Sequence, residues 1–282
     1  MAAKAEDVAR NYPSRRLPGV HEMRLAWKTP LICQANGMAA GARGERKAMI
    51  MLGILSLDTA FQRIPGDVGN PDSYPFAAQV RVVRGADSTA VVKDGIIDEA
   101  LLQSFIAAAV ALEKQGASAI VSTCGFLITA QSRIAAAVQI PVMLSALSMY
   151  PVVHATTPGR IGILTASQSA LGAAALDAAG ANMPDVVIQG MQHEPDFAAT
   201  FLVQRDQQRR SLDRAAMERS VVAAALDLQA RAPDLRAIIL ECGNLPPYAQ
   251  ALRAATGLPI YHLLDAAIWM MAANSGTKHS MA

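Results

Sequence analysis

The sequence contains few cysteines, few aromatic residues and no long hydrophobic run. Three cysteines in 282 residues are too few for a disulfide framework, so a reducing cytoplasm is the expected location. Aromatic residues make up 5%, which argues against a nucleic-acid platform of stacked rings. No apolar run approaches the roughly 20 residues that span a bilayer, and residues 1–16 hold no apolar stretch of signal-peptide type. We therefore expect neither a membrane nor a nucleic acid as partner.

Signatures of bound cofactors are missing as well. Neither the Gly-x-Gly-x-x-Gly pattern nor the P-loop pattern for binding phosphates occurs in the sequence. No group of His, Cys and Asp residues has the spacing of metal ligands. The sequence therefore predicts no metal site and no organic cofactor.

The charge is unevenly distributed along the chain. Residues 1–48 hold nine basic and four acidic residues, which leaves 16 basic and 19 acidic residues for the remainder. A mildly acidic body does not attract polyanions. Because residues 1–48 show no sustained hydrophobic period, we interpret them as a non-catalytic basic extension, and Cys33 within them as incidental. The alternatives are sequence upstream of a true start at Met49 or Met51, or a targeting peptide.

Short apolar runs alternate with helix-length segments from Met49 onward, and 52% of all residues are hydrophobic. This alternation is typical of parallel βαβ units, with a well-buried core and helices on both sheet faces. The predicted strands are 49–55, 79–84, 118–122, 142–147, 160–165, 186–190, 237–240 and 260–264. The predicted helices are 97–112, 127–138, 167–179, 211–230, 249–255 and a last one from 265.

The two halves of this pattern repeat each other. A Gly-Ile-Leu strand opens each half, and each half has a strand that ends in Cys-Gly, at Cys124 and Cys242. Pro141 and Pro259 each follow 17 residues after the cysteine. The repeat predicts an α/β fold of two pseudo-symmetric parallel-sheet lobes. We assign 49–152, completed by a C-terminal helix over 265–282, to the first lobe and 153–264 to the second lobe. A single doubly wound sheet or a (β/α)8 barrel is the alternative.

Cys124 and Cys242 carry the predicted chemistry. Both follow strands at the sheet edge where ligands bind in open parallel sheets. Backbone N–H groups at a helix start stabilise an anion, so we expect lowered thiol pKa values and some thiolate near neutral pH. If the lobes face each other, the two thiols meet one ligand from opposite sides, which suits inversion at a carbon next to a carboxylate or carbonyl. The alternative is that each cysteine is a small buried residue of the core.

The stretch from Ser56 to Phe76 has turn residues and no periodicity. A loop of about twenty residues in a compact domain is usually functional or disordered. Because it leaves the carboxyl end of the first strand, we predict a lid over the cleft. Arg63 in this loop is a candidate for binding a carboxylate through its forked donors, and a solvated surface arginine is the alternative.

Four segments together resemble the hallmark segments of the aspartate/glutamate/hydantoin racemase superfamily. They are Gly53–Leu55, Ser122–Gly125, Arg160–Thr165 and Glu241–Asn244. The resemblance extends from about Met49 to the C-terminus. It implies two similar lobes with the active site between them, a PLP-independent isomerase that uses Cys124 and Cys242 as acid and base, and a homodimer. It also places the substrate near Asp58, Thr59, Thr123, Gly125, Phe126, Thr165, Gly243 and Asn244.

Two departures from the family pattern affect the choice of substrate. Gly125-Phe126 follow the first cysteine, where amino-acid racemases often have Asn-Thr, and Gly243-Asn244 stand where glutamate racemases have Thr-His. Glutamate is therefore not the expected substrate. The predicted function is a cofactor-independent racemase or epimerase that acts beside the carboxylate of a small amino-acid-like molecule. The alternatives are a decarboxylase or cis–trans isomerase of small dicarboxylates on this fold, and a non-catalytic two-lobed ligand-binding protein.

Overall fold

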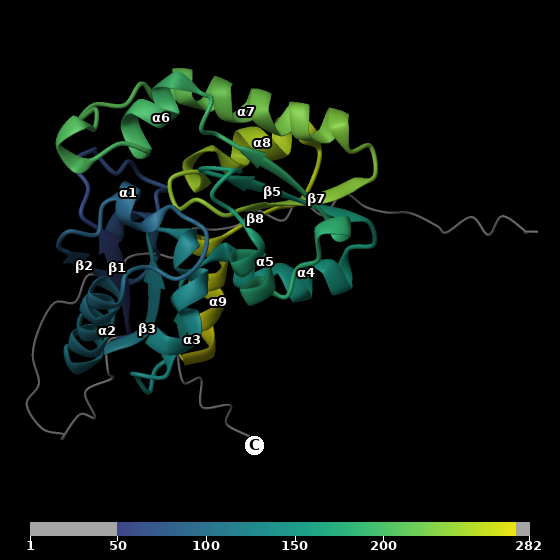
Figure 1. Cartoon of the computed structure of the whole chain (residues 1–282). Coiled ribbons are helices and arrows are strands. Elements are labelled where there is room, and N and C mark those ends of the chain that lie inside the picture. The colour runs from purple at the N-terminus through teal and green to yellow at the C-terminus, as the bar shows by residue number, and fades with distance from the viewer. Residues whose placement is uncertain (1–49, 275–282) are drawn as a thin grey trace, which may run out of the picture. The chain divides into compact units, whose positions relative to one another are not determined.

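Parallel strands form two sheets in the part of the chain that the computed structural model describes, residues 50–274. The first sheet has the order β2-β1-β3-β4 and the second the order β6-β5-β7-β8. The strands of the first sheet are β1 (Met51–Leu57), β2 (Ala77–Val83), β3 (Ala117–Ser122) and β4 (Val142–Met143). Those of the second are β5 (Arg160–Thr165), β6 (Val186–Gly190), β7 (Leu235–Leu240) and β8 (Ile260–His262). Figure 1 shows the two sheets with their helices.

Helices connect the strands in each lobe. The α-helices are α1 (Ser88–Val91), α2 (Glu99–Lys114), α3 (Gln131–Ala135), α4 (Tyr150–Thr156), α5 (Ala173–Ala179), α6 (Pro195–Phe201), α7 (Arg214–Arg231), α8 (Ala249–Thr256) and α9 (Leu263–Asn274). Short 3-10 helices are η1 (Pro71–Ser73), η2 (Gly125–Ala130), η3 (Ala146–Met149), η4 (Met183–Asp185), η5 (Arg205–Gln207) and η6 (Pro246–Tyr248). In Figure 1, α7 and α8 lie above the second sheet and α4 and α5 below it.

The longest two helices begin at aspartate caps. The Asp98 side chain accepts hydrogen bonds from the first turn of α2, and the Asp213 side chain does the same for α7. Each cap satisfies backbone N–H groups that have no partner within the helix. The face of α2 that includes Leu102 and Phe105 is fully buried and packs against β1, β2 and β3.

The backbone of one sheet repeats that of the other in detail. Besides the common strand order, the N–H of Ile120 donates to the carbonyl of Pro141 at 2.8 Å, and the N–H of Ile238 donates to that of Pro259 at 2.9 Å. These bonds explain the repeated Cys-to-Pro spacing, because the proline carbonyl joins each sheet just before its last strand. The predicted fold class, two pseudo-symmetric parallel-sheet α/β lobes, is confirmed.

The last segment of each lobe contacts the sheet of the other lobe. Helix α9 follows the second sheet but contacts β3 and β4 of the first, and the side chain of Asn274 donates to the carbonyl of Ser118 at 3.0 Å. In the same way η3, which follows β4, contacts β7. The predicted basic extension over residues 1–48, including Cys33, and residues 275–282 of the predicted last helix lie outside the described residues.

Several predicted elements are shorter in the structure because polar side chains bind the backbone. The strand predicted over 142–147 ends at Met143, since the Ser145 hydroxyl accepts from the N–H of Leu147 and starts η3. The strand predicted over 260–264 ends at His262, whose N–H donates to the carboxylate of Asp265 in α9. The helix predicted over 127–138 is divided into η2 and α3, and that over 167–179 is reduced to α5.

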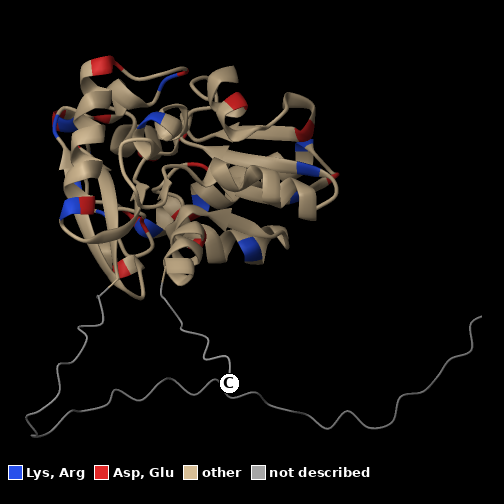
Figure 2. Ribbon diagram, turned by 90° about the horizontal axis from the view of Figure 1, so that it is seen from below, with Lys and Arg blue, Asp and Glu red and all other residues tan. Residues whose placement is uncertain are grey.

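The distribution of charge and the hydropathy of the helices bear on possible partners. Basic and acidic residues lie interspersed over the described chain (Figure 2). None of the helices in residues 50–274 is both long and apolar enough to cross a membrane.

Candidate active site

Cys124 lies two residues after β3, and Cys242 lies two residues after β7. These strands pair with β1 and β5, the first strands of their sheets. The N–H of Thr123 donates to the carbonyl of Leu55 at 3.0 Å, and the N–H of Glu241 donates to that of Leu164 at 2.9 Å. Sheet pairing therefore extends to the residue before each cysteine. Immediately afterwards each cysteine carbonyl accepts an N–H three residues later, at 3.2 Å for Cys124 and 3.1 Å for Cys242. The two thiols thus occupy equivalent positions in the two lobes.

The lobes approach each other closely at the glycines that follow the cysteines. A Cβ atom on Gly125 would lie 2.3 Å from the carbonyl oxygen of Glu241, and one on Gly243 would lie 2.5 Å from that of Thr123. Each of these carbonyls belongs to the residue before the opposite cysteine. The contact therefore requires glycine on both sides, and it brings the backbones of the two cysteines together.

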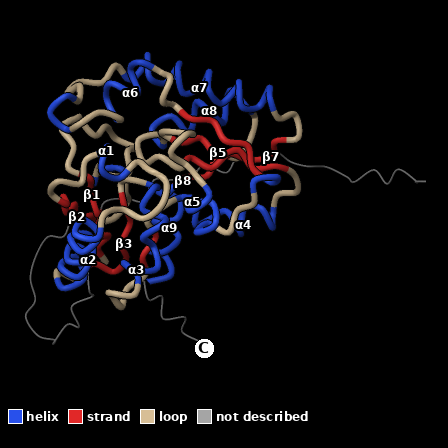
Figure 3. The backbone as a smooth tube through the Cα atoms, viewed as in Figure 1, coloured by secondary structure: helices blue, strands red, loops and turns tan. Residues whose placement is uncertain are grey.

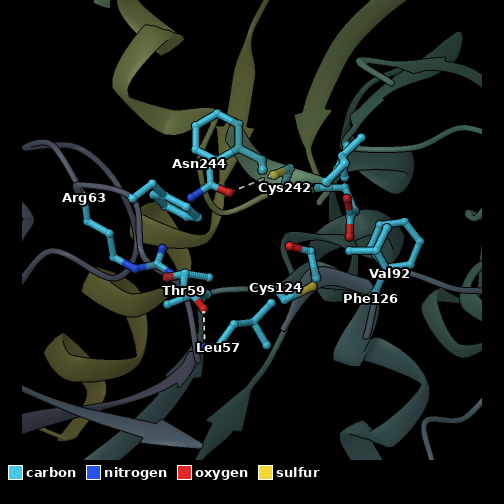
Figure 4. A pocket seen from close by; sticks show the side chains of 16 residues that line it. Leu57, Thr59, Arg63, Val92, Cys124, Phe126, Cys242 and Asn244 are labelled. Carbon is cyan, nitrogen blue, oxygen red and sulfur yellow. Dashed lines mark hydrogen bonds between the residues drawn. The ribbon is translucent and has the colours of Figure 1, made fainter. Parts of the chain in front are cut away.

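Both cysteines line one pocket. Loops gather between the strands of the two sheets (Figure 3). Cys124 and Cys242 are free thiols, each 7% exposed, and Figure 4 shows them on opposite sides of the pocket. The cavity has a volume of about 20 Å³, which is about enough for one water molecule. A larger ligand therefore requires the surrounding loops to move.

The loop of residues 58–76, which we call the lid loop, reaches across to the second lobe. Asp67 accepts a hydrogen bond from the amide of Asn244 at 2.6 Å, and the N–H of Val68 donates to the carbonyl of Gly243 at 3.0 Å. The Cys242 thiol donates to the other end of the Asn244 side chain, at 3.5 Å from Sγ to Oδ1. A continuous polar chain therefore links this thiol to the lid loop.

Arg63 continues this chain on the pocket side of the lid loop. Its guanidinium donates to the Asp67 carboxylate at 2.9 Å and to the hydroxyl of Thr59 at 3.2 Å. It lies 4.9 Å from the centre of the Phe61 ring, within range of a cation–π interaction. The side chain is 13% exposed, so Arg63 is a mostly buried pocket residue and not a solvated surface arginine.

Glu241 is the charged residue of the site that sequence reasoning missed. Its Oε2 accepts from the Thr165 hydroxyl at 2.8 Å, whereas its Oε1 is buried with no hydrogen-bond partner. Burial raises the pKa of the Glu241 carboxyl to about 7. The available signal was a carboxylate placed between an apolar strand and a cysteine, where a charged residue is rarely buried without a partner.

The two thiols have raised pKa values, so the prediction of lowered ones is wrong. Burial raises the pKa of Cys124 to about 12 and that of Cys242 well above its ordinary value, and the charge of Glu241 raises both further. Backbone N–H groups of Phe126 and Asn244 lower these pKa values, as expected from the loop geometry, but burial outweighs them. Without a ligand, both thiols are protonated at neutral pH.

The structure brings most of the predicted site residues to this pocket. Those that line it together with both cysteines are Thr59, Arg63, Thr123, Gly125, Phe126 and Asn244. Thr123 also accepts the N–H of Leu57 at its hydroxyl, at 3.0 Å. That bond fixes the end of β1 beside Cys124.

Three predicted substrate-binding residues do not line the pocket. Asp58 forms ion pairs with Arg205 at 2.9 Å and with Arg84 at 3.5 Å. Thr165 is fully buried and supports Glu241. Gly243 lies with its backbone against Thr123. Asp58 and Gly243 follow strands and Thr165 ends β5, but the contacts of each are with other protein groups.

Most of the other lining residues are apolar. They are Leu57, Phe61, Ser88, Val92, Ala166, Phe201, Leu202, and Glu241 described above. Phe61 and Phe201 meet edge to face with ring centres 4.8 Å apart. Because Phe201 comes from α6 of the other lobe, no local pattern near Phe61 could reveal this wall.

Within residues 50–274, no group of three or more His, Cys, Asp or Glu side chains is arranged to hold a metal ion. The ionisable groups at and beside the pocket are two thiols, the carboxylate of Glu241 and the pair of Arg63 and Asp67.

The chain is similar in sequence to enzymes of one named activity. The chain is 32% identical over 224 residues to a dimethylsulfoniopropionate lyase from Durusdinium sp. clade D. The aligned region covers 77% of this chain and 72% of that protein. It is also 30% identical over 232 residues to dimethylsulfoniopropionate lyase 3 of Emiliania huxleyi (strain CCMP1516), of which it spans only 59%.

Solved structures of similar fold support the two-lobed architecture. Allantoin racemase from Klebsiella pneumoniae superimposes with a TM-score of 0.54 at 17% identity, over 79% of this chain and 86% of that one. Unliganded arylmalonate decarboxylase gives 0.54 at 15% identity, over 81% and 94%. At such identities the likeness shows the fold alone. Residues 71–271 match the family model described as Asp/Glu/Hydantoin racemase, and the chain therefore belongs to that family.

Proposed function

We propose that this protein is a lyase that splits dimethylsulfoniopropionate, or a close analogue, into dimethyl sulfide and acrylate. The observation that carries the proposal is the pair of thiols in one small pocket of a chain 32% identical to a dimethylsulfoniopropionate lyase. Racemases and this lyase share their first step, because both remove a proton from the carbon next to a carboxylate. The proposed elimination differs from the predicted isomerase activity in the step that follows proton removal.

The elimination needs one base. A cysteine thiolate takes a proton from the carbon next to the carboxylate, and the electron pair of that bond forms the carbon–carbon double bond. The bond from the next carbon to the positive sulfur breaks, and dimethyl sulfide leaves with its electron pair. The thiol then gives its proton to water, so the balanced products are dimethyl sulfide, acrylate and a proton.

Cys124 is the better candidate for this base. The positive charge of Arg63 lowers the pKa of the Cys124 thiol, whereas the negative charge of Asp67 raises that of Cys242. Burial raises both pKa values most, followed by the charge of Glu241, and the charge of Cys124 also raises that of Cys242. Beside these larger effects, Arg63 is a cation near Cys124 that favours its thiolate.

Arg63 is the proposed anchor for the substrate carboxylate. A guanidinium has five N–H donors in a fork that matches a carboxylate, and two of its contacts are to Asp67 and Thr59. As the proton leaves, negative charge spreads onto the carboxylate oxygens, and a cation that already lies beside them stabilises it. Apolar and aromatic side chains around Cys124 suit the two methyl groups on the sulfur.

Racemisation or epimerisation of a small amino-acid-like carboxylate is the second candidate. The presence of two thiols at equivalent positions in opposite lobes favours it, because inversion requires an acid and a base on opposite faces of the carbon. A homodimer acting without a cofactor in the cytoplasm remains part of either proposal.

Headspace gas chromatography after incubation with dimethylsulfoniopropionate tests the first proposal. We expect dimethyl sulfide and acrylate in equal amounts from the wild type, and none above background from the Cys124→Ser variant. If no dimethyl sulfide forms, while incubation with amino acids or hydantoins in deuterated water places deuterium on an intact substrate, the second candidate is correct.

A further inference from the structure

The Glu241 carboxylate is the charged group of the pocket that no other group neutralises. Its residue is 2% exposed, and it forms no ion pair with any described residue of the chain. The hydroxyl of Thr165 donates to Oε2 at 2.8 Å, and the backbone N–H of Ala166 lowers the pKa of the carboxyl. Oε1 has no partner. A buried carboxylate oxygen without a partner is costly, so this arrangement requires a function.

The other charges of the pocket are already paired. Arg63 and Asp67 neutralise each other at 2.9 Å, and Asp67 also accepts from Asn244. Both cysteines are neutral as thiols. The Glu241 carboxylate, when ionised, is thus the charge of the described pocket without a counter-ion, and a positive group of a ligand placed beside it supplies one. The carboxylate of the same ligand adds a negative charge, so it shares the Arg63 guanidinium with Asp67.

We infer that Glu241 Oε1 is the binding group for the cation of the substrate, and that it selects zwitterions whose positive group carries methyl groups in place of N–H donors. The inference rests on the proposed function for the identity of the ligand, a sulfonium. It makes Glu241 a specificity-determining residue, and Thr165 a positioning residue that holds its other oxygen.

The apolar surroundings of Glu241 explain the choice of a methylated cation. An ammonium group brings three N–H donors, each of which needs an acceptor once it is buried. Glu241 Oε1 is one acceptor, whereas Phe61, Phe126 and Phe201 offer ring faces and edges. A sulfonium has no donors, and aromatic rings attract it through the cation–π interaction.

The same geometry disfavours dianions. A malonate brings two negative charges into a pocket that already holds an unpaired carboxylate, and repulsion between buried like charges is strong. This distinguishes the chain from a decarboxylase of dicarboxylates, which was one of the alternatives that the sequence left open.

A bound cation also changes the state of the thiols. The charge of Glu241 raises the pKa of both Cys124 and Cys242, so a positive group placed beside that carboxylate offsets its effect on each. The substrate thereby promotes formation of the thiolate that attacks its own proton. An uncharged or anionic molecule in the pocket lacks this effect.

Calorimetric titration with a matched pair of ligands tests the inference. Dimethylsulfoniopropionate and 4-methylpentanoate have nearly the same shape, but the second has a neutral carbon in place of the positive sulfur. Titrations use the full chain with both cysteines changed to serine, so that no turnover occurs. Three proteins are compared: this parent, the parent with Glu241→Gln, and the parent with Glu218→Gln. Glu218 lies on α7 outside the pocket.

The expected result is a loss of cation preference in one variant alone. The parent should bind the sulfonium more tightly than 4-methylpentanoate, and Glu241→Gln should weaken the sulfonium about 10- to 100-fold while leaving 4-methylpentanoate unchanged. Glutamine can still accept from Thr165 with its amide oxygen, and thermal melting checks that the variant folds. Glu218→Gln should change neither affinity.

Three outcomes would overturn the inference: no detectable sulfonium binding to the parent, equal weakening of both ligands by Glu241→Gln, or no weakening of either. Failure of the proposed function is a separate result. If the wild-type protein releases no dimethyl sulfide but the cation preference disappears with Glu241→Gln, the cation site stands and only the reaction is wrong.

Discussion

The two lobes share a backbone pattern but differ in the residue that precedes each cysteine. Thr123 in the first lobe and Glu241 in the second occupy equivalent positions, since the N–H of each extends the pairing of its sheet. The Thr123 hydroxyl binds the end of β1, whereas the Glu241 carboxylate keeps one oxygen free at the pocket. The duplicated architecture places two thiols at equivalent positions, and the residue before the cysteine adds a carboxylate in the second lobe only.

The two lobes also differ in the connection that follows the first strand of each sheet. In the second lobe α5 lies between β5 and β6, as is usual for parallel strands, but in the first lobe the lid loop replaces a helix of that kind. The lid loop supplies Arg63 and Asp67 to the pocket region and hydrogen bonds to the second lobe. The second lobe therefore has a regular helical connection at this point, whereas the first has a loop that hydrogen-bonds to the opposite lobe.

The largest expected effect is a difference between the cysteines. Cys124→Ser should lower kcat/KM for dimethylsulfoniopropionate by about 100- to 10,000-fold, because the proposed base is lost. Cys242→Ser should lower it less, since elimination needs one base. Steady-state kinetics on both variants measure this. Equal losses would show that both thiols act in the elimination and would contradict the assignment of Cys124 alone as the base.

The next effect concerns the pH dependence of stability at Glu241. Its pKa is about 7 in the folded protein against an ordinary 4.5, so the folded state favours the protonated form. The contribution of the Glu241 carboxyl to the free energy of unfolding is complete below pH 4.5. This contribution falls by about 3 kcal/mol as the pH rises through 7. Glu241→Gln should therefore melt at a higher temperature than wild type at pH 8.5.

The difference in melting temperature between Glu241→Gln and wild type should shrink toward pH 5, where the wild-type carboxyl is protonated. Glu218→Gln serves as the control and should show no such trend. A difference that stays constant across this pH range would contradict the buried, unpaired state of Glu241.

A smaller effect tests the symmetry of the contact between the lobes. Gly125→Ala and Gly243→Ala each place a Cβ against the carbonyl of the opposite lobe, at 2.3 and 2.5 Å. Both should lower the free energy of unfolding by about 1–3 kcal/mol, as measured by urea denaturation. Gly125→Ala also touches the Glu241 carboxylate, 2.4 Å from Oε1, so it alone should weaken the sulfonium ligand further. If Gly125→Ala and Gly243→Ala bind the sulfonium ligand equally well, the Cβ at position 125 does not disturb the Glu241 carboxylate.

The smallest effect is expected at Asp58, which the family resemblance placed near the substrate. Its ion pairs are to Arg205 and Arg84, whose side chains are 51% and 80% exposed. Asp58→Asn should therefore lower stability by about 1 kcal/mol or less and leave kcat/KM unchanged. A drop in kcat/KM beyond about tenfold would show that Asp58 reaches the substrate when the lid loop moves.

Repetition along the chain was sufficient to predict the two lobes and the equivalence of Cys124 and Cys242. The repeated spacing reflects equivalent positions, because the carbonyls of Pro141 and Pro259 accept equivalent hydrogen bonds in the two sheets. Helix ends were less predictable, because side chains such as Ser145 and Asp265 bind nearby backbone N–H groups and change where elements start.

The amino-acid sequence by itself determined that two thiols end equivalent strands in a chain of parallel βαβ units. Tertiary structure alone decided their ionisation, because a thiol pKa depends on burial and on charges that arrive from elsewhere in the chain. Glu241 meets Gly125 across the lobes, and Arg63 pairs with Asp67 on a loop anchored to the second lobe. These distances arise only when the chain has folded, whereas strand periodicity is present in the sequence before it folds.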